Sequence, residues 1–301
     1  REHLSREKSH GDRLLAWHWG PRPDGSSGVL DANTASDANL DYALALILAG
    51  RRGWLAPAGL PPYLDEARRV AADIMAHEVV ELPSGALLLA PGNWRENHPP
   101  YLMNPSYFSP AAYRLFAQQG FNPRWGRLHA DVYPALERLT RKLGEMSGVG
   151  LIPDWAVVAA DGTFSPHPEK DTNFGWEAVR LPWRVALDRL WFGDLNAARL
   201  SRTQFLSFFQ QEFRTRGKLA AVYRYDGTPQ VEFDSPVLYA GALAAALAGG
   251  DQEFAWQMAR KILSFYHQEG EAAYFVSPDN YYADNWAWFG LALYASWVRL
   301  F

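Results

Sequence analysis

Apolar residues return every three or four positions along most of this chain of 301 residues, and that spacing constrains the fold more than any other feature. One such run contains Leu40, Leu44, Ile47 and Leu48. Eight further segments show the same spacing, at residues 63–80, 109–119, 127–143, 178–192, 195–213, 236–248, 252–267 and 283–300. We therefore predict about nine helices.

The connections between these helices are rich in Gly, Pro and Asn, and several are long. They cover residues 20–28, 57–62, 91–105, 148–175 and 225–234. Short and long connections alternate, which indicates stacked helical hairpins with a binding site built by the long loops. Residues 86–89 and 156–159 favour strands, each as half of a small surface hairpin. We predict one all-α domain over residues 1–301, with its paired helices closed into a toroid.

Composition excludes several classes of protein. With 48% hydrophobic and 21% charged residues, the chain can bury a large core and is not disordered. Its net charge of -4 gives no bulk attraction to phosphate backbones or anionic lipids. No stretch approaches the roughly 20 apolar residues of a membrane span. We therefore expect neither nucleic acid nor a membrane as a partner.

Several catalytic chemistries lack the residues that they need. The chain has no cysteine, which excludes a thiolate nucleophile and Cys-ligated zinc. Its histidines show no HExxH or other metal-ligand spacing, and GxSxG, Walker A and GxGxxG motifs are absent. We therefore predict neither a metal nor a cofactor.

The first twelve residues, REHLSREKSHGD, contain no apolar segment of the kind found in a signal peptide. The chain also begins with Arg1 instead of Met. We expect that a processed or separate segment precedes Arg1 in the native protein.

Candidate acids cluster where loops lead into helices. Asp37 lies near the start of an apolar helix, with Asp41 one turn later, and helix capping is the alternative role. Glu177 and Arg180 are three residues apart, so an ion pair is the alternative there. Asp154 follows Ile-Pro in an extended turn, where it can accept backbone hydrogen bonds.

Aromatic residues are abundant, with 13 Trp, 14 Tyr and 16 Phe, and many lie beside Gly, Pro, Asn or Asp. Flat rings with a polar edge suit a cleft that stacks sugar rings, although Trp also fills the cores of helical proteins. Because other chemistries are disfavoured, carboxylates in an aromatic, amide-rich cleft indicate glycoside hydrolysis or sugar binding.

Four segments resemble glycoside hydrolase family 8, the inverting β-1,4-glycanases that include bacterial cellulases, chitosanases and xylan-acting enzymes. They are ASDANLD at 35–41, GLIPDW at 150–155, WEAVRLPWR at 176–184 and the tyrosine pair at 281–282. They occur in the family's order and span nearly the whole chain. The resemblance implies an (α/α)6 barrel, six inner and six outer helices, with a glycan cleft across one end. Nine predicted helices fall short of twelve, so we expect a barrel that lacks its N-terminal helix.

The resemblance also assigns catalytic roles. Asp37 matches the Asp that holds the sugar at the cleavage site. Glu177 matches the general base, which is Asp in many members, and its extra methylene moves the carboxylate by roughly 1.5 Å. The family's general acid is a Glu in a Ser-Glu-Gly segment ahead of the Trp matched by Trp17. No such segment precedes Trp17. We therefore expect the acid upstream of Arg1, or a relative that binds glycan without cutting it.

Further residues are implied to contact the sugar. They are Trp17, Asn104, Tyr107, Trp176, Arg180, Tyr281 and Tyr282. For each aromatic residue, packing within the protein is an equal alternative. If Glu177 is not the base, Asp154 and Asp171 are the next candidates.

These features predict a secreted or periplasmic, monomeric endo-β-1,4-glycanase that inverts the anomeric carbon. A polysaccharide or oligosaccharide is the expected partner, with cellulose or another β-glucan ahead of chitosan and xylan. Two alternatives stay open. One is a catalytically silent glycan-binding barrel associated with exopolysaccharide production. The other is a polysaccharide lyase, which needs a Tyr/His or Tyr/Arg pair as base and acid.

Overall fold

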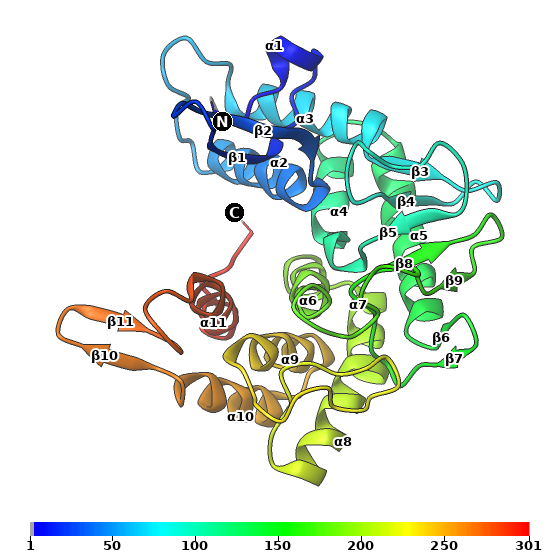
Figure 1. Cartoon of the computed structure of the whole chain (residues 1–301), viewed down its shortest axis with the longest axis vertical. Helices are drawn as coiled ribbons and strands as arrows, with labels where there is room; N and C mark the ends of the chain where they lie inside the picture. The colour runs from blue at the N-terminus through cyan, green and yellow to red at the C-terminus, as the bar shows by residue number, and fades with distance from the viewer. Residues whose placement is uncertain (1–2, 301) are drawn as a thin grey trace.

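The computed structural model describes residues 3–300, and all nine predicted helices are present (Figure 1). Their bounds are α2 (Ser36–Arg51), α3 (Tyr63–His77), α4 (Pro110–Gln118), α5 (Arg124–Leu139), α6 (Arg180–Phe192), α7 (Leu195–Leu200), α8 (Ser207–Arg216), α9 (Pro236–Gly249), α10 (Gln252–Leu263) and α11 (Tyr281–Tyr294). The π-helical segment Ser201–Leu206 joins α7 to α8, so these form the one helix predicted over 195–213. The short helix α1 (Glu7–His10) and the 3₁₀ turn Pro105–Tyr107 were not predicted.

The helices form an inner and an outer layer. The inner helices α2, α4, α6, α9 and α11 follow one another around an arc, in which α4 packs on α6, α6 on α9 and α9 on α11 (Figure 1). Helices α3, α5, α7 and α10 each pack outside an inner neighbour. Within residues 3–300 this gives five inner and four outer helices, where the family barrel has six of each. The predicted paired-helix barrel with fewer than twelve helices is confirmed.

Small residues let the inner helices approach closely. Every residue of α9 except Leu247 is buried. A Cβ on Gly241 would lie 2.8 Å from the carbonyl oxygen of Val179, and one on Gly290 would lie 2.8 Å from the Cβ of Ala240. Glycine at these two positions therefore allows α9 to lie against both α11 and the turn before α6.

Short antiparallel strands occupy the connections. The pairs are β1 (Ala16–Pro21) with β2 (Ser27–Thr34), β3 (Val79–Glu81) with β4 (Leu87–Leu89), β6 (Lys142–Leu143) with β7 (Met146–Ser147), and β10 (His267–Glu269) with β11 (Ala272–Tyr274), while β5 (Tyr101–Met103), β8 (Ala156–Val158) and β9 (Phe164–Ser165) form one sheet. The two predicted strands are present as β4 and β8, but their surface position was wrong. Residues 87–89 are at most 1% exposed because β4 packs against α5, and β8 is the central strand of its sheet.

Four helices end earlier than the apolar spacing suggested. Helix α11 ends at Tyr294, whereas α3, α5 and α10 end at His77, Leu139 and Leu263, and the chain beyond each of these three enters a strand. Strand pairing satisfies the backbone of these residues, so the apolar spacing overestimates the helix length. Among residues 3–300, no helix combines the length and apolarity that a membrane crossing requires.

Candidate active site

Two predicted carboxylates, Asp37 and Glu177, meet at one arginine. Asp37 lies in the first turn of α2, and Glu177 lies in the turn before α6. Oδ2 of Asp37 is 3.1 Å from Nη1 of Arg180, and Oε2 of Glu177 accepts a hydrogen bond from Nη2 of the same guanidinium. The two side chains are 16% and 36% exposed, so a ligand can reach both. Residues from distant parts of the sequence therefore form one open acidic site.

A second residue holds the Glu177 carboxylate. Nδ2 of Asn104 donates to its Oε2 at 3.0 Å, while Oδ1 of Asn104 accepts from the backbone N–H and the hydroxyl of Ser106. Asn104 was predicted to contact the sugar, but it is 0% exposed and lies behind Glu177. Within residues 3–300, Oε1 of Glu177 has no hydrogen-bond partner. That oxygen is the one available to a water molecule.

Tyrosine and a second ion pair support Arg180. The guanidinium of Arg180 lies over the ring of Tyr107, 5.3 Å from the centroid. Burial raises the pKa of Tyr107 to about 12. One turn along α2, Asp41 accepts bonds of 2.7 and 2.8 Å from the guanidinium of Arg184. Two arginine to aspartate pairs therefore connect α2 and α6 beside the site.

Asp154 holds the turn that carries the proposed base. Its Oδ1 accepts the backbone N–H groups of Gly175, Glu177 and Ala178 at 3.1, 3.1 and 2.6 Å. A Cβ on Gly175 would lie 2.7 Å from Oδ2, so glycine is needed there. Asp154 is 5% exposed, and burial raises its pKa to about 7. The predicted alternative role, accepting backbone hydrogen bonds, is the one the structure shows. Asp171 lies in the same loop, and its Oδ1 accepts a 2.9 Å hydrogen bond from the backbone N–H of Asn173.

A buried acid that was not predicted from the sequence lies beside the start of α2. Glu78 follows α3 and is 0% exposed. Its Oε1 accepts from the hydroxyl of Thr34 and, at 2.8 Å, from Nδ2 of Asn39, while Oε2 has no partner. Burial raises the pKa of Glu78 to about 7. This carboxyl joins the end of β2 to α2 next to Asp37. The one feature of the sequence that could have indicated a buried acid here is that this Glu directly precedes two valines.

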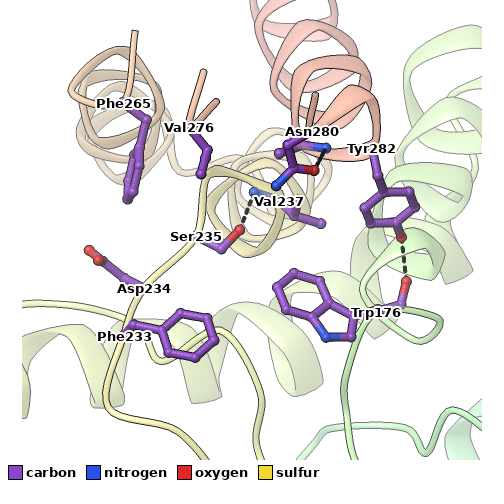
Figure 2. A pocket seen from close by; sticks show the side chains of 10 residues that line it. Trp176, Phe233, Asp234, Ser235, Val237, Phe265, Val276, Asn280 and Tyr282 are labelled. Atoms are coloured by element: carbon purple, nitrogen blue, oxygen red, sulfur yellow. Dashed lines mark hydrogen bonds between the residues drawn. The ribbon is translucent and has the colours of Figure 1, made fainter. Parts of the chain in front are cut away.

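The two tyrosines of the predicted pair differ in position: Tyr282 lies at the site and Tyr281 is exposed to solvent. Figure 2 shows a pocket in which Trp176 and Tyr282 form one wall, and the hydroxyl of Tyr282 donates to the carbonyl of Trp176. Their rings meet edge to face with centroids 6.4 Å apart. Tyr281, by contrast, is 76% exposed. The structure therefore brings Tyr282 to the site and leaves Tyr281 in solvent.

Trp17 lies on the β1–β2 hairpin that leads into α2. It is 57% exposed, and its Nε1 donates to Asp31 at 2.8 Å. Its ring lies 4.9 Å from that of His18, so its other face is open to a ligand and the predicted sugar contact stays a prediction.

One group of side chains has the donor atoms of a metal site. The ligand atoms of His129, Asp188 and Asp194 lie within 4.8 Å of one another. However, Nε of Arg114 lies 3.0 Å from Asp188, and its Nη2 binds Asp194. The guanidinium already supplies positive charge to these carboxylates, so the group is an ion-pair network between α4, α5 and α6.

Comparison with known proteins agrees with this geometry. The model of glycosyl hydrolases family 8 matches residues 1–283. The chain belongs to this family. Endoglucanase A of Acetivibrio thermocellus is 31% identical over 261 residues, which cover 85% of this chain and 51% of that protein. An endoglucanase of Escherichia coli K12 is 28% identical over 207 residues, covering 66% of this chain and 49% of that protein. The chain thus spans about half the length of these relatives.

Solved structures share the fold. The endo-1,4-D-glucanase of Vibrio fischeri superposes with a TM-score of 0.72 at 21% identity, covering 95% of this chain and 78% of that one. A β-1,3-1,4-glucanase of Paenibacillus sp. X4 gives 0.77 at 20% identity, covering 97% and 74%. The predicted (α/α)6 barrel class is therefore confirmed.

Proposed function

We propose that this protein hydrolyses β-1,4-glycosidic bonds of a β-glucan with inversion at the anomeric carbon. The convergence of Asp37 and Glu177 on Arg180 is the observation that carries the proposal. Membership of family 8 and the endoglucanase names of its relatives support it. In this proposal residues 1–301 form one catalytic domain that acts without a metal or cofactor.

Glu177 acts as the general base. Its Oε1 takes a proton from a water molecule, whose oxygen attacks the anomeric carbon while the bond to the leaving oxygen breaks on the opposite face. Asn104 and Arg180 fix Oε2, which directs Oε1 at the water. Holding the base in this way lowers the entropic cost of reaching the transition state.

Asp37 orients the sugar at the cleavage point. Its carboxylate stabilises the positive charge that develops on the ring, and Arg180 reduces the repulsion between Asp37 and Glu177. The leaving oxygen takes a proton from a general acid, the role that the resemblance gives to a Glu ahead of Trp17. Among residues 3–300, no third carboxyl group bonds to Arg180.

We propose that the protein acts in the periplasm or outside the cell, where its polysaccharide substrate is accessible. We also propose that it acts as a monomer, because one chain supplies Asp37, Glu177 and Arg180. Size-exclusion chromatography with light scattering measures the oligomeric state.

The replacement Glu177→Gln tests the proposal. We expect a loss of turnover of about 10²- to 10⁴-fold on carboxymethyl-cellulose and mixed-linkage glucan, with cello-oligosaccharide binding retained. Glu145→Gln is the matched control, because that side chain is 99% exposed and lies 3.9 Å from Lys142. Reducing-end assays give the rates, and NMR of the first product gives its anomer. Unchanged turnover in Glu177→Gln refutes the base, and a wild type that binds without cutting identifies the silent barrel.

A further inference from the structure

A buried carboxyl group that the proposed mechanism does not use lies beside the segment that carries Asp37. Helix α3 packs along α2 (Figure 1), and Glu78 directly follows α3. The side chain of Glu78 is fully buried. Because burying a carboxyl group costs free energy, the hydrogen bonds that it accepts indicate what it holds in place.

One oxygen of Glu78 binds residues on both sides of Asp37. Its Oε1 accepts a hydrogen bond from the hydroxyl of Thr34, the last residue of β2. The same oxygen accepts a 2.8 Å bond from Nδ2 of Asn39, in the first turn of α2. Thr34 lies three residues before Asp37, and Asn39 lies two residues after it. A single acceptor therefore holds the end of the strand and the start of the helix, between which Asp37 lies.

Other hydrogen bonds leave both donors directed at Glu78. Oδ1 of Asn39 accepts the backbone N–H of Leu15 at 2.9 Å, so its amide N–H₂ is left for Glu78. The hydroxyl of Thr34 accepts the backbone N–H of Asn93 at 3.0 Å, so its own hydrogen is left to donate. Thr34 and Asn39 are buried, and water cannot replace the acceptor. Glu78 must therefore present an oxygen at this point.

The backbone of Glu78 is itself fixed. Its N–H donates to the carbonyl of Ile74 at 2.8 Å, in the last turn of α3, and its carbonyl accepts the N–H of Ala90 at 2.7 Å. The carbonyl of Ala90 in turn accepts the hydroxyl of Ser36 at 2.6 Å, directly before Asp37. The carboxyl group therefore extends from a rigid point of the chain toward the junction of β2 and α2.

The second carboxyl oxygen is not needed for this network. Oε2 of Glu78 has no hydrogen-bond partner among residues 3–300. Burial, together with the nearby charge of Asp37, raises the pKa of Glu78 to about 7. Below that pH the group is mostly neutral. Glutamine would keep its size, its neutral state and the acceptor oxygen, whereas leucine would keep only its approximate size.

We propose that Glu78 is a positioning residue for Asp37, a role that rests on the proposed function because Asp37 orients the sugar there. Through Thr34 and Asn39, its carboxyl group fixes the first turn of α2. Oδ2 of Asp37 then lies 3.1 Å from Nη1 of Arg180, at the open side of the site. A small movement of this turn displaces the Asp37 carboxylate from the sugar ring. Loss of Glu78 therefore raises the barrier although it removes no group that touches the substrate.

A double-mutant cycle between Glu78 and Asp37 tests this role. We expect Glu78→Leu to lower kcat on mixed-linkage glucan by about 10- to 100-fold. In the Asp37→Asn background the same replacement should lower kcat by less than about twofold, because the charge that Glu78 positions is already lost. Glu78→Gln should keep the wild-type kcat. Glu81→Gln is the matched control, since this acid lies on the adjoining strand β3 and pairs at the surface with Arg124.

Three kinetic results would overturn the role. They are an unchanged kcat in Glu78→Leu, the same loss in both Asp37 backgrounds, and a loss in Glu78→Gln as large as in Glu78→Leu. Should Glu78→Leu fail to fold, Thr34→Val removes one of the two donors and keeps the shape of the side chain. It is expected to lower kcat by about three- to tenfold with Asp37 present and by less than about twofold in Asp37→Asn.

Calorimetric titration with a cello-oligosaccharide separates this role from the proposed function. In the Glu177→Gln background, binding is measured without turnover, and Glu78→Leu should weaken it by about threefold only where Asp37 is present. A wild type that binds the oligosaccharide but cuts no glycan refutes the proposed hydrolysis, and the affinity cycle still decides whether Glu78 positions Asp37. A wild type that neither binds nor cuts refutes both.

Discussion

Asp154→Ala tests how much the activity depends on the anchoring of the turn that carries Glu177, while the Glu177 side chain itself is left in place. In the structure, one oxygen of Asp154 accepts three backbone N–H groups, two of them belonging to Glu177 and Ala178. The alanine side chain removes that acceptor and leaves buried donors without partners. The turn that carries Glu177 then loses its anchor, while Glu177 keeps its own side chain.

The size of the effect follows from these contacts. Each lost bond to a buried group costs about 1–3 kcal/mol, and three bonds that share one oxygen are not additive, so we expect a total of about 3 kcal/mol. A shift of Glu177 by about 1 Å lowers kcat by about 10²-fold with little change in KM. Asp154→Asn keeps an oxygen acceptor in the same place. Because burial raises the pKa of Asp154 to about 7, Asn also mimics its neutral form, and we expect it to restore most of the stability and kcat.

Urea unfolding and steady-state kinetics on mixed-linkage glucan measure both quantities. Asp161→Ala is the control, because Asp161 also accepts a backbone N–H, that of Thr163 at 2.9 Å, but on an exposed turn. It is expected to change neither quantity measurably. Wild-type stability and kcat in Asp154→Ala would refute the anchoring role. If Asp154→Asn lowered the stability and kcat as much as Asp154→Ala, the negative charge of Asp154 and not its acceptor oxygen would anchor the turn.

Two further predictions concern the residues around this turn. Burial raises the pKa of Glu78 from 4.5 to about 7, so the folded state holds this proton more tightly than the unfolded chain. The resulting stability, about 3 kcal/mol, is complete below pH 4.5 and is lost as the pH rises through 7. In urea unfolding from pH 4 to 8, Glu78→Gln should remove this fall, and an unchanged pH profile would contradict it. Tyr282→Phe removes the hydrogen bond to Trp176 and should cost about 1 kcal/mol and raise KM, whereas the exposed Tyr281→Phe should change neither.

The helices were predictable because their apolar faces pack between two layers. Helix α5, for example, buries Trp125, Leu128, Val132 and Leu136, at three-to-four-residue steps. The β1–β2 hairpin was missed because its strands alternate weakly, with exposed Trp17 and Trp19 on β1. The ends of α3 and α5 were overestimated because the strands after them carry the same apolar types, Val79 and Val80 in β3 and Leu143 in β6.

The site was less predictable than the helices, because it depends on how distant segments pack. The resemblance paired Asp37 with Glu177, which no local pattern could do, since their meeting depends on where α2 and α6 lie in the barrel. The tyrosine pair shows the limit. Helix α11 begins at Tyr281, and successive residues of a helix point about 100° apart, so one of the two must turn away. The sequence does not say which, and the packing of α11 against α9 decides it.

Four acids in this region share one chemistry and differ in role because of what surrounds them. Asp37 and Glu177 are partly exposed and bind a guanidinium, so solvent and a ligand can reach them. Asp154 and Glu78 are buried among neutral donors, and burial raises the pKa of both. An exposed acid can take a proton from water or stabilise a cationic sugar, whereas Asp154 and Glu78 bond to buried backbone and side-chain donors and hold them in place. The assignment of base and anchor therefore depends on burial and partner, which residue type alone does not reveal.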